Sequence, residues 1–141
     1  MGTWFGFSAH GIQFVPEWPG PDYLENVGNV GWTDQSGLRR GWGVQFRGRS
    51  RKHNWFHCAV PTLGLYVHLG TVLQEIHVSF ETFGSAVVDR IHVWSGGTRI
   101  YARDGLALSG DHIKNPFVDF VTLPVNGGLN VCVHANFGAP G

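Results

Sequence analysis

The chain has 141 residues, and its ten basic and ten acidic side chains give a formal net charge of zero. Apolar residues make up 43% of the chain, which excludes intrinsic disorder. The zero net charge disfavours a nucleic-acid-binding protein that relies on its overall charge. At this length we expect one domain that spans residues 1–141.

The composition indicates a protein built from strands. Glycine accounts for 21 residues, which is about twice its usual share of roughly 7%. Aromatic residues reach 13%, whereas charged residues reach only 14%, against about 25% in an ordinary domain. Aromatic side chains favour strands and glycines favour tight turns, while helices need more alanine, leucine, glutamate and lysine.

The first segment, residues 2–15, is predicted to form one bent strand or two short ones, with glycines at the bends. It has no basic start followed by an apolar run, so we expect no signal peptide. No stretch of the sequence approaches the ~20 apolar residues of a membrane span, so no membrane association is expected. We therefore expect a cytoplasmic protein, with export by a non-classical route as the alternative.

Residues 16–31 are predicted to be an irregular loop because they contain three prolines and three glycines. Trp18 and Tyr23 lie in this loop. Long loops in compact domains often carry function, so these two aromatic residues are candidates for the rim of a binding site. The alternative is a structural loop that Trp18 pins in place.

Residues 41–60 are predicted to form a hairpin of two strands joined by a basic turn. Up to Arg47, apolar and polar residues alternate with the period of a half-buried strand. Strand residues resume at Trp55 and stop before Pro61, which has no N–H for a ladder. The turn, residues 48–53, has no acid, and its basic or titratable side chains are Arg49, Arg51, Lys52 and His53.

The second half of the chain continues in short strands. In residues 87–94, alternation places Asp89 and Ile91 on one face and His92 and Trp94 on the other. A three-residue turn with two glycines joins this strand to the next. The further segments predicted from their period are 72–81, 98–102, 117–123 and 129–137, together with a short piece at 106–111.

About eight to ten strands and no helix result from this pattern. We predict an all-β antiparallel sandwich, most simply jelly-roll-like, with a closed barrel as the alternative. A near-neutral surface with sparse charge also favours self-association, so we expect a homo-oligomer.

Several short motifs resemble a known family. The residues that match are Gly41-Trp42-Gly43 with Gln45-Phe46, Trp55-Phe56-His57 with Pro61-Thr62, His92-Val93 with Gly96-Gly97, and Gly110 with His112. The sequence resembles a set of small, uncharacterised bacterial β-sandwich proteins classed as a domain of unknown function. The resemblance implies the sandwich fold and no activity.

Eight histidines invite metal or acid–base chemistry. The chain has no H-x-H pair and no C-x-x-C spacing, so we expect neither a metal nor a cofactor. A metal-free enzyme is the alternative to a binding protein, with His57, His92 and His112 as acid–base groups and Asp111 to orient one of them. Each of these histidines also has a structural interpretation, with its ring bonded to a backbone carbonyl.

The two cysteines lie in predicted strands. Cys58 follows His57, and neighbours on a strand point to opposite faces, so these two residues form no catalytic dyad. We expect Cys58 and Cys132 to be reduced in a cytoplasmic protein, and a disulfide between them stays open if the protein is exported.

Six tryptophans exceed what a small core usually needs. We therefore predict a non-catalytic binding module whose favoured partner is a carbohydrate, or another small molecule, because sugar rings stack on flat aromatic side chains. An anionic ligand bound by the basic segment 39–53 is a second alternative, whereas nucleic acid is disfavoured. The predicted ligand-binding residues are Arg47, Trp55, His57, His92 and Trp94, with Trp18 and Tyr23 at the rim.

Overall fold

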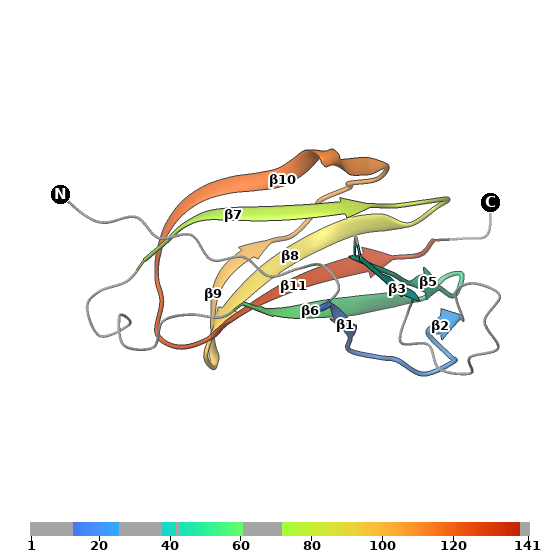
Figure 1. The fold of residues 1–141 in the computed structure, drawn as a ribbon, viewed down its shortest axis with the longest axis horizontal. Helices are drawn as coiled ribbons and strands as arrows, with labels where there is room; N and C mark the ends of the chain where they lie inside the picture. Colours follow the sequence, from blue (N-terminus) through green and yellow to red (C-terminus); the bar gives the residue numbers. More distant parts are fainter. Residues whose placement is uncertain (1–12, 26–37, 42, 61–71, 139–141) are drawn as a thin grey trace.

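The computed structural model describes residues 13–25, 38–41, 43–60 and 72–138, which contain eleven strands and no α-helix (Figure 1). Within these residues no helix has the length and apolarity to cross a membrane. The strands are β1 (Val15–Pro16), β2 (Leu24–Glu25), β3 (Leu38–Arg40), β4 (Gly43–Gln45), β5 (Arg47–Gly48), β6 (His53–Val60), β7 (Val72–Glu81), β8 (Val87–Ser95), β9 (Thr98–Arg103), β10 (Asp111–Pro124) and β11 (Leu129–Asn136).

The longer strands form two antiparallel sheets that face each other. Five strands are ordered β1-β6-β11-β8-β9, and β10 pairs with β7 in a second layer, which lies above the first in Figure 1. Apolar side chains fill the space between the layers, namely Ile76 and Val78 from β7, Val88, Ile91 and Val93 from β8, and Val133 from β11. The predicted all-β sandwich is confirmed. Among the described strands, the larger sheet ends at β1 and β9 without closing into the alternative barrel.

The strand period decides which side chains enter this core. Ile91 and Val93 are fully buried between the sheets, so His92 between them points to the opposite face. Cys132 is the cross-strand partner of both His57 and His92, so these three residues form one row across β6, β11 and β8. We call the face of the five-stranded sheet that is turned away from β7 and β10 the outer face.

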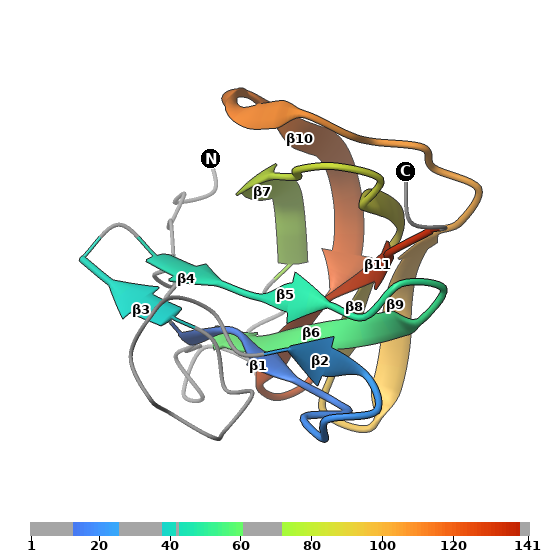
Figure 2. The ribbon, with the colours of Figure 1, turned by 90° about the vertical axis from the view of Figure 1, so that its right-hand side faces the viewer.

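The predicted hairpin at residues 41–60 is wrong in its pairing. β4 pairs with β3 and β5 pairs with β2, whereas β6 pairs with β1 and β11. Figure 2 shows the short strands beside β6 at one end of the molecule. The register of β6 with β11 runs over eight residue pairs, and this long ladder offers β6 more backbone hydrogen bonds than the two- and three-residue strands before it. Trp42 lies outside the described residues.

His53 is the first residue of β6 and does not belong to the turn, contrary to the prediction. Alternation along β6 then places His53 on the outer face with Trp55 and His57. His53 therefore joins Trp55 and His57 on the outer face, so β6 contributes three imidazole or indole rings there.

A β-bulge corrects the predicted faces of β8. Arg90 pairs with His134, but Val88 pairs with the next residue, Ala135, so Asp89 is the extra residue of the bulge. The bulge re-aims Asp89 from the core side to the outer face, where its Oδ1 lies 2.5 Å from Nδ1 of His134.

The two strands of the smaller sheet differ from prediction in their ends. β10 begins at Asp111 and includes the predicted strand 117–123, with Pro116 in a register shift that needs no ladder N–H there. A second register shift lies between Phe120 and Leu123, and at that end of β7 Leu73 packs against the core whereas Val72 is exposed.

The predicted loop at residues 16–31 is described up to residue 25. A second apolar cluster, built on Leu24, Phe56 and Ala135, anchors it to the five-stranded sheet. The backbone of Trp18 is fixed by a reciprocal pair of bonds with the buried Asn54. The Trp18 N–H donates to Oδ1 at 3.0 Å, and Nδ2 donates to the Trp18 carbonyl at 2.8 Å. Of the predicted strand segment 2–15, residues 2–12 lie outside the described residues, and β1 begins at its last residue, Val15.

Candidate functional site

The outer face gathers histidine and tryptophan side chains from three neighbouring strands. Apart from Asp89 and Arg90 at the bulge, each strand contributes alternate residues, and the antiparallel register aligns them in rows. The residues are His53, Trp55 and His57 on β6, Asn130, Cys132 and His134 on β11, and Asp89, Arg90, His92 and Trp94 on β8.

Trp55 lies at the centre of this face. The centroid of its ring is 4.8 Å from the ring centroid of His92 and 4.8 Å from that of His134. Nε2 of His92 lies 2.8 Å from Oδ1 of the exposed Asp104, and this hydrogen bond is the main cause that lowers the pKa of the Asp104 carboxyl. His92 itself is buried, and its hydrogen-bond partner among the described residues is Asp104.

The loop residues extend the aromatic cluster at one end of β6. The Trp18 ring meets the His53 ring edge-on at a centroid distance of 5.2 Å, and Tyr23 stacks on Trp18 at 5.3 Å. Nζ of Lys52 lies 5.4 Å from the centroid of the Tyr23 ring. The predicted rim residues Trp18 and Tyr23 therefore lie beside the outer face.

His57 has three polar neighbours. Its Nε2 lies 3.2 Å from Oε1 of Glu17, its Nδ1 lies 3.2 Å from Sγ of Cys132, and Nδ2 of Asn130 lies 3.3 Å from the same Nδ1. A carboxylate only accepts hydrogen bonds, so Nε2 carries the proton and Nδ1 accepts from the thiol and the amide. Among the described residues, Oδ1 of Asn130 is buried and has no hydrogen-bond partner.

Glu17, His57 and Cys132 have the order of a nucleophilic triad, but the thiol has the wrong protonation state. Cys132 is 2% exposed, and its burial, together with the negative charge of Glu17, raises the pKa of its thiol to about 11. The thiolate is the nucleophilic form of cysteine, and it is scarce at neutral pH here. Cys132 therefore acts as a buried hydrogen-bond partner of His57.

Trp94 is the exposed aromatic residue of the outer face. It is 38% exposed, and its cross-strand partners are Asn130 on β11 and Arg99 on β9. An indole next to a carboxamide and a guanidinium offers a flat apolar surface with hydrogen-bonding groups at its edge.

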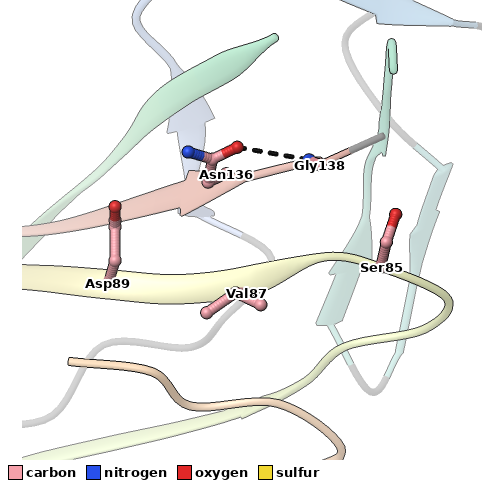
Figure 3. A pocket seen from close by; sticks show the side chains of 5 residues that line it. All are labelled: Ser85, Val87, Asp89, Asn136 and Gly138. Carbon is pink, nitrogen blue, oxygen red and sulfur yellow. Dashed lines mark hydrogen bonds between the residues drawn. The ribbon is translucent and has the colours of Figure 1, made fainter. Parts of the chain in front are cut away.

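An open pocket of about 240 Å³ lies at the other end of the outer face. Asp89 and Asn136 line it from neighbouring strands, together with Ser85, Val87 and Gly138 (Figure 3). Oδ1 of Asn136 accepts a hydrogen bond from the Gly138 N–H at 3.2 Å.

Two candidates for acid–base chemistry lie elsewhere. Both ring nitrogens of His112 lie 3.1 Å from backbone carbonyl oxygens, those of Ser109 and Asn115, and its ring stacks on Phe80. Asp111 accepts bonds from the backbone N–H groups of residues 113 and 114, and these bonds lower the pKa of its carboxyl. His112 and Asp111 therefore hold a turn in the smaller sheet, and they do not converge with His57 and His92.

Arg47 also lies away from the outer face. Its Nε is 3.2 Å from Glu25, and Arg49 contacts the same carboxylate at 3.4 Å. Arg49 Nε also donates to the carbonyl of Pro21. Two cations of the basic segment thus share one acid, which weakens the case for an anionic ligand there.

Cys58 and Cys132 are both free thiols. Cys58 is paired with Val131 in the register of β6 and β11, so it points to the inner face, and Cys132 points to the outer face. The sheet therefore separates the two sulfur atoms. Among the described residues, no three histidine, cysteine, aspartate or glutamate side chains are grouped so as to hold a metal ion.

Several residues of the site carry a weak signal in the sequence. The alternation of Asn130, Cys132 and His134 marks a polar face of β11, but only the register shows that it adjoins His57 and His92. Glu17 has no distinguishing pattern at all, because it reaches His57 through the pairing of β1 with β6.

The fold and the outer face define a small β-sandwich protein with a sheet face rich in histidine and tryptophan. Residues 33–140 match the family of unknown function DUF6623, and the chain belongs to this family. The expected resemblance to an uncharacterised domain family is thereby confirmed. No curated protein and no solved structure matches the chain.

Proposed function

We propose that the protein is a non-catalytic ligand-binding module, and that carbohydrate binds at the Trp94 end of the outer face. The observation that carries this proposal is the exposed ring of Trp94, which lies between Asn130 on β11 and Arg99 on β9 in the sheet register.

The chemistry of sugars matches the groups at this end of the sheet. A sugar ring has an apolar face that stacks on an indole, and hydroxyl groups at its edge that donate and accept hydrogen bonds. Arg99 offers donors on one side of Trp94, and the Glu17 carboxylate bonded to His57 offers acceptors on the other side of Asn130. Sugar recognition generally requires a flat aromatic ring together with hydrogen-bond donors and acceptors, and this end of the sheet has all three.

A metal-free acid–base enzyme is the second candidate. The specific observation in its favour is the pairing of His57 with Glu17, because both side chains are partly exposed and a carboxylate orients the imidazole. In this candidate enzyme His57 acts without His112, because the two residues lie on different sheets. The enzyme is distinguished from the binding module if the protein turns over a substrate, binds no sugar, and loses its turnover in the His57→Gln variant.

Trp94→Ala tests the proposal directly. A glycan array identifies the ligand class, and tryptophan fluorescence titrated with the methyl glycosides of glucose, galactose, mannose and N-acetylglucosamine measures affinity. We expect the variant to weaken binding at least about tenfold, which corresponds to ~1.4 kcal/mol. Asn130→Ala is expected to act in the same direction.

Phe120→Ala is the matched control. Phe120 is 77% exposed on β10, so the variant removes an exposed aromatic ring from the other sheet. Binding is expected to stay unchanged in this variant. A blank array, or equal weakening by Trp94→Ala and Phe120→Ala, contradicts the proposal.

The proposal includes a cytoplasmic homo-oligomer. The zero net charge with only 14% charged residues supports self-association, and the two free thiols support a reducing compartment. Light scattering coupled to size-exclusion chromatography measures the oligomeric state.

A further inference from the structure

A series of hydrogen bonds crosses the outer face from the Asp89 pocket to the protein surface. Nδ1 of His134 lies 2.5 Å from Oδ1 of Asp89, and Nε2 of His134 lies 2.9 Å from Nδ1 of His53. His134 is 5% exposed beneath the ring of Trp55, whereas His53 is exposed at the start of β6. A buried imidazole thus connects a carboxylate on one side with a solvent-facing imidazole on the other.

The carboxylate fixes the positions of the protons in this series. An ionised Asp89 only accepts hydrogen bonds, so Nδ1 of a neutral His134 carries its proton and Nε2 presents its lone pair. Nδ1 of His53 must then donate to that lone pair. It follows that Nε2 of a neutral His53 has no proton, which is the less common tautomer of a free imidazole.

The unprotonated nitrogen belongs to an exposed side chain and lies on the side of the ring away from His134. Nε2 of His53 has no hydrogen-bond partner among the described residues, and the ring meets Trp18 edge-on. The cross-strand partner of His53 is Asn136, which lines the pocket together with Asp89 (Figure 3). The neighbouring Lys52 has its ammonium group over the ring of Tyr23.

We propose that Asp89, His134 and His53 form a proton relay that makes Nε2 of His53 a dedicated acceptor for a hydroxyl group of a ligand bound at the exposed His53 ring beside Trp18. His53 is the residue that touches the ligand, and His134 and Asp89 are positioning residues. Compounds with hydroxyl groups are the ligand class, because Nε2 presents a lone pair to a hydrogen-bond donor.

The relay also accepts a full proton when the ligand hydroxyl is acidic enough. That proton passes to Nε2 of His53, and the ligand oxygen keeps the electron pair of the broken O–H bond. The Nδ1 proton of His53 then passes to Nε2 of His134, so the positive charge ends on the ring that faces the Asp89 carboxylate. Opposite charges at this separation, largely removed from water, stabilise the product state.

This inference deepens the proposed function, on which it rests for the kind of ligand, by adding a second contact at the opposite end of the same sheet face. The hydrogen-bond series itself is a property of the free protein. Its first test therefore uses no ligand, and its failure is separable from a failure of sugar binding.

Long-range nitrogen–proton correlation spectra of the histidine rings give the first test. At about pH 8, where an ordinary histidine is neutral, we expect both His53 and His134 to carry the proton on Nδ1. His77, an exposed histidine on β7 whose Nε2 lies 3.2 Å from Oε1 of Glu75, serves as the control and is expected to carry its proton on Nε2. A proton on Nε2 of His53 overturns the relay.

Acylation by diethyl pyrocarbonate gives the second test, because this reagent attacks unprotonated imidazole nitrogens. Mass spectrometry is expected to show His53 reacting faster than His77. Asp89→Asn removes the charge at the pocket end and is expected to slow acylation of His53, because the orienting carboxylate no longer fixes the tautomer of His134 and, through it, that of His53. His77 is expected to keep its rate in this variant.

Asp89→Asn also separates the relay from a structural role. The Asp89 side chain is 26% exposed in an open pocket, so the variant is expected to fold, and circular dichroism checks this. An unchanged acylation rate of His53 in a folded Asp89→Asn protein overturns the inference. If the tautomers and rates are as expected and no methyl glycoside binds, the relay stands and the proposed sugar binding fails.

Discussion

Single polar residues on the outer face are held in defined protonation states by their partners. Glu17 assigns the ring proton of His57 to Nε2, and this leaves Nδ1 to accept from Cys132. The thiol in turn stays neutral because it is buried. Chemistry at this position therefore depends on the imidazole and not on the sulfur atom.

The neutral thiol of Cys132 predicts slow alkylation in the folded protein. Its pKa of about 11, against 9.0 for an ordinary thiol, means about 100-fold less thiolate at a given pH, and burial slows access further. Because the folded pKa is raised, the associated stability is present below pH 9 and is lost as the pH rises through the folded value. Iodoacetamide labelling followed by mass spectrometry measures the rate.

The urea-unfolded chain is the reference for this experiment. Cys58, whose pKa is also raised by burial, is expected to be protected in the same way. Labelling of Cys132 at the unfolded rate under native conditions contradicts the structure.

At the scale of the element, a polar contact ties the edges of the two sheets together. The Tyr101 hydroxyl on β9 donates to Oδ2 of Asp119 on β10 at 2.6 Å, and Arg103 contacts the same oxygen at 3.2 Å. The Tyr101 bond is the main cause that lowers the pKa of the Asp119 carboxyl. Burial and this carboxylate raise the pKa of Tyr101, so the pair is a neutral phenol with an ionised acid.

Tyr101→Phe tests this link between the sheets. The variant keeps the ring and loses a hydrogen bond to a charged acceptor, so we expect the free energy of unfolding to fall by about 1.5 kcal/mol at neutral pH. The folded pKa of Asp119 is depressed, so the stabilisation is present above its unfolded value and is lost as the pH falls through the folded one. Urea unfolding is expected to show the difference between the two proteins shrinking as the pH falls below about 4. A difference that is independent of pH contradicts this account.

The whole molecule is stabilised by the apolar layer between the sheets. Ile91 is fully buried there and contributes to the main cluster. Removing its side chain deletes buried apolar surface and leaves a cavity.

Ile91→Ala is therefore expected to lower the free energy of unfolding by about 3 kcal/mol. Ile113→Ala, the same substitution at a residue that is 59% exposed on β10, is expected to change it by less than about 0.5 kcal/mol. Urea denaturation measures the free energy of unfolding of both variants. Similar losses in the two variants contradict the placement of Ile91 in the core.

Much of the fold was predictable because strand alternation is a local property. Spacing alone predicts that Ile91 lies on the face opposite His92 and Trp94, which the burial of Ile91 confirms, and β7, β8 and β11 have nearly the predicted limits. The candidate site was predictable only in part. His57, His92, Trp55 and Trp94 do share one sheet face, whereas Arg47 and His112 lie elsewhere because their strands pair with other partners.

The sequence by itself determined that the chain forms strands, which residues alternate along each strand, and that histidine and tryptophan are abundant, because these properties depend on nearest neighbours. The tertiary structure decided which strands pair, where the bulge turns Asp89 towards His134, and that Cys132 lies between His57 and His92. Pairing and register depend on the free energy of the whole sandwich, in which distant segments compete for the same ladder and the same core. The neighbours of each polar side chain, and therefore its chemistry, follow from that competition.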